Sequence, residues 1–206
     1  MPGADLRGAD LRRHIPRVDL REAELGGASF PDAPPGAVWD LSGARLDTLG
    51  RRLIARTLRL DGAHIGAVDL RAGNPLSARG ARFEATDLGS FATGGANLAG
   101  ATLVDTAVPF GHHVNLSGAR LERGALELFD GGGLAVEARF AGLDLDLSNG
   151  QANLRGARFE SDTAVSCGLC LLTAARLAGQ TTLSNRFGAA FGREVDFEGA
   201  TLSRGD

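Results

Sequence analysis

The sequence contains no lysine and no tyrosine, and only two cysteines, one tryptophan and one methionine among its 206 residues. Two cysteines cannot build the disulfide framework of a small secreted domain. No segment approaches the roughly 20 consecutive apolar residues that a membrane span requires. The N-terminus also lacks the apolar run behind a basic segment that marks a secretory signal. We therefore expect one domain over residues 1–206, located in the cytoplasm.

Surplus positive charge is also missing, because 22 arginines face 25 acidic residues and the net charge is −3. Nucleic-acid binding depends on such a surplus to meet phosphates, so direct nucleic-acid partners are not expected. Glycine, in contrast, is abundant at 30 residues. A glycine costs about 1 kcal/mol in a helix interior, whereas turn-dense folds accommodate it. The composition therefore favours a turn-dense fold over a helix-rich one.

A five-residue phrase recurs along the chain. It opens as Ala4-Asp5-Leu6-Arg7-Gly8 and returns, among other places, at 96–100, 114–118, 152–156 and 195–199. A large apolar residue stands at the centre, a small one stands two places before it, and glycine often stands two places after it. A period of five fits neither the 3.6 of a helix nor the 2 of a plain strand. A short strand followed by a corner explains it, with two inward-facing residues in each unit.

This phrase resembles the consensus of the pentapeptide-repeat family, A-(D/N)-L-x-x, from Ala4 to Leu202. The resemblance implies a right-handed quadrilateral parallel β-helix with four units in each coil. About ten such coils, at the roughly 4.8 Å spacing of stacked strands, give a rod of about 48 Å.

The repeat frame predicts which side chains face the interior and where the frame slips. The inward set includes Leu6, Leu11, Leu88, Leu98, Leu116, Leu121, Leu154 and Phe197. The longest uninterrupted frame has its centres at Cys167, Leu172, Leu177, Thr182, Phe187, Gly192, Phe197 and Leu202. The frame slips at 31–38, 73–80, 109–113 and 129–133, which we expect to be bulges or short loops in a continuous solenoid.

Cys167 and Cys170 have the C-x-x-C spacing of redox motifs and of half a zinc site. The repeat frame points both side chains inward, and a second C-x-x-C for zinc is missing. We predict two buried, reduced, metal-free thiols, with a disulfide or a metal site as the alternatives.

His112 and His113 fall at a frame slip beside Pro109, which places them on an exposed loop. Adjacent side chains on an extended chain point in different directions, so the two rings are poorly placed to chelate one metal ion. No set of residues specifies a reaction, and we predict no catalytic residues, no metal and no cofactor. The alternative is an enzyme or small-molecule-binding protein that forms a cleft from the irregular segments around His112, His113 and Asp130.

Arginines follow the central residues of the first repeats. Arg7, Arg12, Arg17 and Arg21 belong to four different sides of a four-sided coil and so form a ring instead of a patch. We expect them to be solvated and paired with acids such as Asp10, Asp19 and Glu22. Phosphate or nucleic-acid binding by this ring is the alternative.

Acidic residues gather in the middle of the chain. Counting repeats places Glu127 and Asp146 one coil apart on one outer side, with Asp144 beside them and Glu122 on the preceding side. We expect this acidic side to bind a protein partner; a merely solvated surface is the alternative.

The resemblance also implies a function. The best-known pentapeptide-repeat proteins bind type II topoisomerases through a rod that mimics duplex DNA, and so give resistance to topoisomerase inhibitors. Duplex DNA carries one charge per about 1.7 Å, so a 48 Å rod needs about 28 negative charges for full mimicry. The net charge of −3 allows only partial mimicry along one side. We predict a non-enzymatic, protein-binding solenoid with DNA gyrase as the candidate partner.

Neither end of the repeat array carries a cap in the sequence. An uncapped β-stack exposes backbone donors and acceptors together with its apolar core. We therefore expect a homodimer through the C-terminal coils around Phe187, Phe191 and Phe197.

Overall fold

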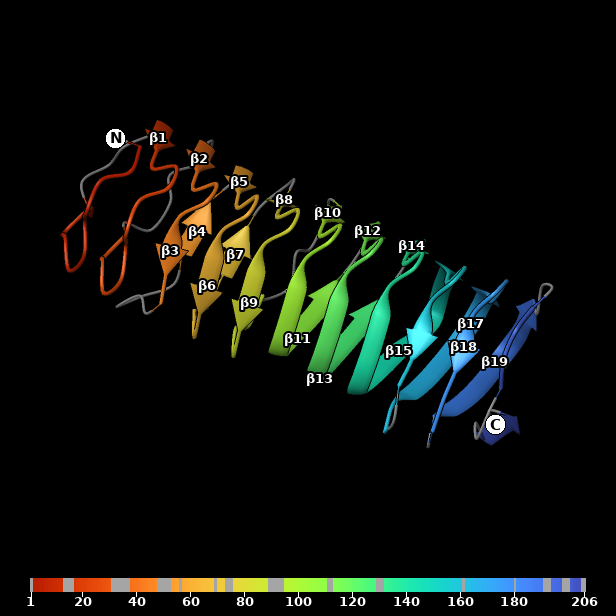
Figure 1. Cartoon of the computed structure of the whole chain (residues 1–206). Coiled ribbons are helices and arrows are strands. Elements are labelled where there is room, and N and C mark those ends of the chain that lie inside the picture. The colour runs from red at the N-terminus through yellow and green to blue at the C-terminus, as the bar shows by residue number, and fades with distance from the viewer. Residues whose placement is uncertain are drawn as a thin grey trace.

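Small and large apolar side chains alternate with polar ones in short segments, and these segments form strands that stack into a rod (Figure 1). The computed structural model describes residues 2–12, 17–30, 38–47, 53–55, 57–68, 70–72, 76–88, 95–110, 113–128, 132–160, 162–179, 181–190, 194–197 and 201–204. These residues contain strands, bridges and turns and no helix. They accordingly include no helix that is long and apolar enough to cross a membrane.

The strands pair in parallel, and most of them join one extended sheet. A separate two-stranded sheet contains β4 and β7. In chain order the strands are Arg17–Asp19 (β1), Val38–Asp40 (β2), Arg45–Leu46 (β3), Leu53–Ala55 (β4), Thr57–Arg59 (β5), His64–Gly66 (β6), Leu70–Ala72 (β7), Leu76–Ser77 (β8), Arg82–Glu84 (β9), Ala96–Asn97 (β10), Thr102–Phe110 (β11), Val114–Asn115 (β12), Arg120–Leu128 (β13), Gly133–Leu134 (β14), Arg139–Asn153 (β15), Arg158–Phe159 (β16), Ala164–Leu171 (β17), Arg176–Leu177 (β18), Thr182–Ala190 (β19) and Thr201–Arg204 (β20).

The pairing defines three sides of the rod. On the first side the order is β1, β2, β5, β8, β10, β12, β14 and then the ends of β15, β17 and β19, so ten segments succeed one another. The second side contains β3, β6, β9, the beginnings of β11, β13 and β15, and then β16 and β18. The third side contains the later parts of β11 and β13, the middle of β15, the beginnings of β17 and β19, and β20. We call each strand segment on one side a rung.

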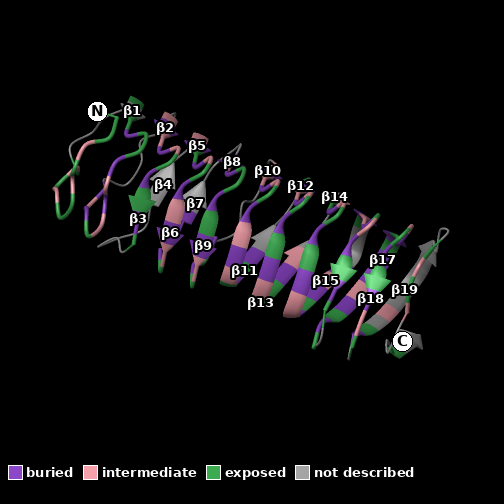
Figure 2. Ribbon diagram, in the orientation of Figure 1, coloured by how far each residue is buried: buried purple, intermediate pink, exposed green. Residues whose placement is uncertain are grey.

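The core consists of equivalent side chains stacked from coil to coil. On the second side the small inward position is alanine in nine successive coils, and every one of these alanines is buried: Ala23, Ala44, Ala63, Ala81, Ala101, Ala119, Ala138, Ala157 and Ala175. The large position two residues later is filled by Leu25, Leu46, Ile65, Phe83, Leu103, Leu121, Phe140, Phe159 and Leu177, all buried. Buried and more exposed residues therefore alternate along strands such as β2, β6 and β9 (Figure 2). Burial of apolar surface in such columns stabilises the fold by about 25 cal/mol for each Å² removed from water.

These observations confirm the predicted all-β, parallel β-solenoid. The predicted inward residues Leu88, Leu98, Leu116, Leu121 and Leu154 are all buried. The predicted inward residues of the terminal coils, Leu6, Leu11 and Phe197, pack against the core but stay partly exposed. A terminal coil has a neighbour on one face only, so its core side chains cannot be fully covered.

Buried threonines support the corner between the second and third sides. Each hydroxyl donates a hydrogen bond to a backbone carbonyl: Thr86 to Glu84, Thr106 to Val104, Thr163 to Glu160 and Thr181 to Ala178. The acceptor lies two residues back in the first two corners and three residues back in the last two. The last two corners are therefore one residue longer.

The longer corner overturns one predicted position. The uninterrupted five-residue frame made Thr182 a central, inward residue, but Thr182 is exposed and Thr181 is buried. The backbone of Leu183 is in register with the buried Val165. The extra residue shifts the frame by one, and in a strand a shift of one moves a side chain to the opposite face.

Several expected loops also contain strand residues. Leu76 and Ser77 form β8, Pro109 lies within β11, and Gly133 begins β14. Residues 31–37, 73–75, 111–112 and 129–131, which cover the rest of most of these segments, lie outside the described residues.

Gly124 lies where the stacking of coils leaves no room for a side chain. Its φ is +142°, and an added Cβ would lie 2.4 Å from the carbonyl oxygen of Thr106 on the neighbouring rung. We expect Gly124→Ala to lower the free energy of unfolding by about 3 kcal/mol, because backbone must move to relieve the clash. Urea denaturation measures the change.

Gly118→Ala is the matched control. Gly118 has a φ of +66°, and an added Cβ there meets no atom within 4 Å. Only the left-handed conformation costs energy, about 1 kcal/mol. Equal losses in the two variants would contradict the close approach at Gly124.

Candidate protein-binding surfaces

The predicted acidic residues come together on the third side of the rod. Glu127 of β13 and Asp146 of β15 are register partners, as repeat counting placed them. Asp144 lies two residues before Asp146 on the same side and is exposed. Glu122 lies on the second side, before the corner, also as expected. We call Glu127, Asp144 and Asp146 the acidic surface.

The acidic surface is short along the rod axis. In the column that contains Glu127 and Asp146, the preceding rung has Pro109, and the next rungs have Ser166 and Ser184. Two adjacent rungs therefore carry all of its negative charge, over about 4.8 Å of axis. Like charges held this close raise the local potential and attract a basic partner at short range.

Three of the four predicted N-terminal arginines are paired with acids within their own repeats. Arg7 forms an ion pair with Asp5, Arg12 with Asp10, and Arg21 with Asp19, at 2.6–2.9 Å. The pairs with Asp10 and Asp19 were expected, and the acid that pairs with Arg7 is Asp5. The exposed Arg17 forms no ion pair with a described residue.

A backbone hydrogen bond explains why the residue before the central apolar residue of the repeat is often Asp or Asn. The side-chain oxygen accepts a hydrogen bond from the backbone N–H two residues later, as in Asp10 with Arg12, Asn115 with Ser117 and Asn153 with Arg155. This bond satisfies a corner amide that has no strand partner.

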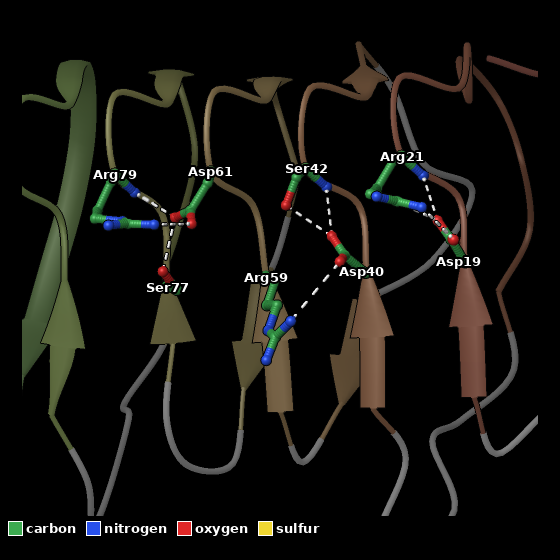
Figure 3. A network of polar contacts seen from close by, with 8 residues as sticks. All are labelled: Asp19, Arg21, Asp40, Ser42, Arg59, Asp61, Ser77 and Arg79. Carbon is green, nitrogen blue, oxygen red and sulfur yellow. Dashed lines mark hydrogen bonds and ion pairs between the residues drawn. The ribbon is translucent and has the colours of Figure 1, made fainter. Parts of the chain in front are cut away.

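The coil of β8 has Ser77 at this position, and its corner is satisfied from the preceding coil. Figure 3 shows Asp61, two residues after Arg59 of β5, reaching forward to this corner. Asp61 accepts hydrogen bonds from the Ser77 hydroxyl at 2.7 Å and the Arg79 backbone N–H at 2.8 Å. Asp40, one coil earlier, accepts from both the hydroxyl and the backbone N–H of Ser42.

A column made mostly of arginine side chains runs along the second side, and the sequence reasoning missed it. In order of pairing, its outward position holds Arg45, His64, Arg82, Thr102, Arg120, Arg139, Arg158 and Arg176. The signal was present as Gly-Ala-Arg followed by Leu or Phe, at 43–46, 80–83, 118–121 and 156–159. These phrases are separated by whole numbers of coils, so their arginines fall in the same column. We call these eight residues the arginine column.

Cys167 and Cys170 are buried as predicted, but they form a disulfide, so the prediction of reduced thiols is wrong. The reason is the length of the corner at this rung. The pairing of β15 with β17 slips between Leu147 and Gln151: one residue of β17, Gly168, lies between the paired positions Cys167 and Leu169, where β15 has three. The short corner brings the two inward side chains to a Cα–Cα distance of 5.9 Å, which a disulfide can span.

A hollow of about 360 Å³ lies on the first side beside the disulfide. It is lined by Gly132, Gly133, Gln151, Ala152, Asn153, Leu169, Cys170 and Leu171. Leu169 and Leu171, which line it, are exposed by 46% and 41%, and Leu134, which follows the lining Gly133, is exposed by 40%. No charged side chain lines the hollow, so the described residues provide no acid–base pair there.

The predicted alternative site is only partly described. His113 is exposed with a φ of +41°, while His112 and Asp130 lie outside the described residues. Within the described ranges, no three His, Cys, Asp or Glu side chains gather closely enough to hold a metal ion.

Comparisons with known proteins add little beyond the fold. No family model matches the chain, and no curated protein matches it. Among solved structures, the chain is similar to HetL, a pentapeptide repeat protein involved in heterocyst differentiation regulation from the cyanobacterium Nostoc sp. strain PCC 7120. The alignment has 20% identity, covers 98% of this chain and 84% of HetL, and has a TM-score of 0.24. That superposition is too loose to carry an argument, and the fold assignment rests on the repeat and the pairing described above.

The Asp5–Arg7 pair predicts a pH dependence of stability. Side-chain and backbone hydrogen bonds from Arg7 lower the pKa of Asp5 from 3.8 to about 2. A carboxylate with a depressed pKa stabilises the fold above its ordinary pKa, and the contribution is lost as the pH falls through the folded pKa. We therefore expect Arg7→Gln to lower the melting temperature at about pH 5, and the difference from wild type to shrink below about pH 4 and vanish below about pH 2.

Arg17→Gln is the control, because Arg17 is exposed and forms no ion pair with a described residue. Its melting temperature should differ from wild type by the same small amount at every pH. Parallel pH profiles for wild type and Arg7→Gln would refute the assignment to the Asp5–Arg7 pair.

Proposed function

We propose that this pentapeptide-repeat solenoid is a non-enzymatic protein-binding rod that engages its partner through the acidic surface. The observation that supports this proposal is the register pairing of Glu127 with Asp146, with the exposed Asp144 beside them. Three carboxylates on two adjacent rungs are complementary to a basic groove on a protein.

The construction of the rod favours binding. Its backbone is held by hydrogen bonds between successive coils, and its core is a stack of buried side chains. Such a surface is ordered before it meets a partner, so docking costs little conformational entropy. The described hollow is lined by no charged side chain.

DNA gyrase is the partner to test first. The resemblance to pentapeptide-repeat proteins that bind type II topoisomerases suggests it, and a groove that binds DNA is basic. Full-length DNA mimicry is not part of the proposal, because the acidic surface spans two rungs and duplex DNA carries a charge every 1.7 Å or so. The proposed contact is local, with partial mimicry on one side of the rod and resistance to gyrase inhibitors as its consequence.

A supercoiling assay tests the gyrase contact. We expect the protein in molar excess to change gyrase supercoiling or its sensitivity to an inhibitor. The triple variant Glu127→Gln, Asp144→Asn, Asp146→Asn should lose most of this effect, because side-chain volume is kept and the charge is removed. Unchanged supercoiling and drug sensitivity with the wild-type protein would rule out gyrase.

The matched control is Glu137→Gln, Glu160→Gln, Asp162→Asn. These three acids are exposed in the same part of the chain but lie outside the acidic surface. The control removes the same charge, so an equal loss of effect in both variants would assign the contact to overall charge and not to the acidic surface.

We also propose self-association through the C-terminal coils. Phe197 packs against the core while remaining partly exposed, in keeping with a terminal coil that a second copy covers. The side chains of Phe187 and Phe191, the other residues expected in this interface, lie outside the described residues. Light scattering at tens of micromolar protein should give the mass of a dimer, and Phe197→Glu should give a monomer that remains folded by circular dichroism. A monomeric wild-type protein would refute this contact.

A further inference from the structure

The C-terminal half of the arginine column concentrates positive charge. Arg120, Arg139, Arg158 and Arg176 occupy four successive rungs, and all four side chains are exposed. Strands of neighbouring rungs lie about 4.8 Å apart, so the four guanidinium groups start from Cα positions spread over about 14 Å.

The two central arginines have the least compensation. Arg120 forms an ion pair with Glu122, and Arg176 forms one with Asp196 of the next coil. Arg139 and Arg158 are register partners of each other, and neither forms an ion pair with a described residue. Two residues after Arg139 stands Ala141, where the equivalent residue after Arg120 is an acid.

The fold does not require arginine at this position. Thr102 occupies the same position of the column, between Arg82 and Arg120, and the coil around it is built in the same way. Like charges directly opposite each other on neighbouring strands are destabilising. A position that lowers stability without a structural need is the kind of local conflict that marks a functional surface.

We infer that Arg120, Arg139, Arg158 and Arg176 bind an acidic segment of a protein partner, with carboxylates placed along the column. A guanidinium group forms paired hydrogen bonds with a carboxylate, and such charge-assisted bonds are stronger than neutral ones. An acidic α-helix presents a side chain on one face every turn, about 5.4 Å. This spacing is close to the 4.8 Å of the rungs, and the long arginine side chains can absorb the difference.

Carboxylates of a protein fit the column better than phosphates of a nucleic acid. Glu122 and Glu160 lie two residues after Arg120 and Arg158 on the same side. The row of positive charge in the arginine column is therefore narrow and bordered by acids. These acids would repel a duplex, whose negative charge is broad and dense. The net charge of −3 likewise disfavours nucleic acid, whose binding depends on the release of many counterions.

This binding surface is separate from the acidic surface. The arginine column lies on the second side and the acidic surface lies on the third, beyond the corner at residues 122–124. Failure of one proposal therefore leaves the other standing.

Fluorescence anisotropy with a labelled, alanine-rich helical peptide that carries one glutamate per turn tests the inference. We expect wild-type protein to bind this peptide, and the same peptide with glutamine for glutamate not to bind. The double variant Arg139→Thr, Arg158→Thr should raise the dissociation constant at least about tenfold, because two charge-assisted contacts are lost. Added salt should weaken wild-type binding.

The control variant is Arg7→Gln, Arg12→Gln. It removes the same two charges from arginines that are already paired with Asp5 and Asp10. We expect its affinity for the peptide to equal that of wild type. Equal weakening by both double variants, or no binding of the glutamate peptide by wild type, would overturn the inference. Tighter binding of a single-stranded or duplex DNA oligonucleotide than of the peptide would overturn it in favour of nucleic acid.

The melting temperature of the variants is a second measurement, and it distinguishes a binding role of these arginines from a structural role. Threonine at two adjacent rungs removes the repulsion between Arg139 and Arg158, so the melting temperature should stay the same or rise. A second variant, Arg139→Glu with Arg158→Glu, places acids between Arg120 and Arg176 and should also remain folded. It should lose the glutamate peptide and bind a peptide with lysine at the same positions. Retained binding of the glutamate peptide by this variant would contradict the inference.

Discussion

Backbone hydrogen bonds between successive coils constrain everything else in this molecule. They hold each residue directly over its equivalent in the next coil, so that Leu121 meets Leu103 on one face and Phe140 on the other. One inward alanine is thereby repeated in nine coils on the second side, and one outward position becomes the arginine column. A side chain therefore packs against the side chains at the same position of the neighbouring coils. The residue type at one position must be compatible with the residues at that position in the coils before and after it.

This constraint makes columns, and not net charge, the proper description of the surface. The net charge of −3 is nearly neutral for a rod of this length, yet four successive rungs of the second side carry arginine. Three N-terminal arginines show the opposite case. Arg7, Arg12 and Arg21 each form an ion pair with an acid in the same repeat. Arginines of equal exposure therefore differ in what they offer a partner, and the difference follows from their register.

The sequence predicted most of the fold because the inward positions are strict: a small residue, one outward residue and a large apolar residue recur with little variation. It predicted the pairing of Glu127 with Asp146 for the same reason. It failed where corners change length. One extra residue before Thr181 moved Thr182 to the surface, and a short corner at Cys167 and Cys170 produced a disulfide where free thiols were expected. Corner length depends on backbone conformation, which a five-residue period does not encode. The arginine column follows no single sequence period, because successive rungs differ in length: Arg82 and Thr102 lie 20 residues apart, and Thr102 and Arg120 lie 18 apart.

The two proposed surfaces occupy adjoining sides of the same coils, and the corner between them keeps their charges apart. Arg120 and Glu127 belong to one strand, β13, but a residue with positive φ, Arg123, turns the chain between them. Arg123 itself pairs with Asp105 of the preceding coil at 2.8 Å, so the corner is close to neutral. Without that turn the acids and arginines would face each other along a single strand and neutralise one another. A rigid corner lets one short stretch of chain present opposite charges in two directions, and this arrangement persists only as long as the coil-to-coil hydrogen bonds hold the corner in place.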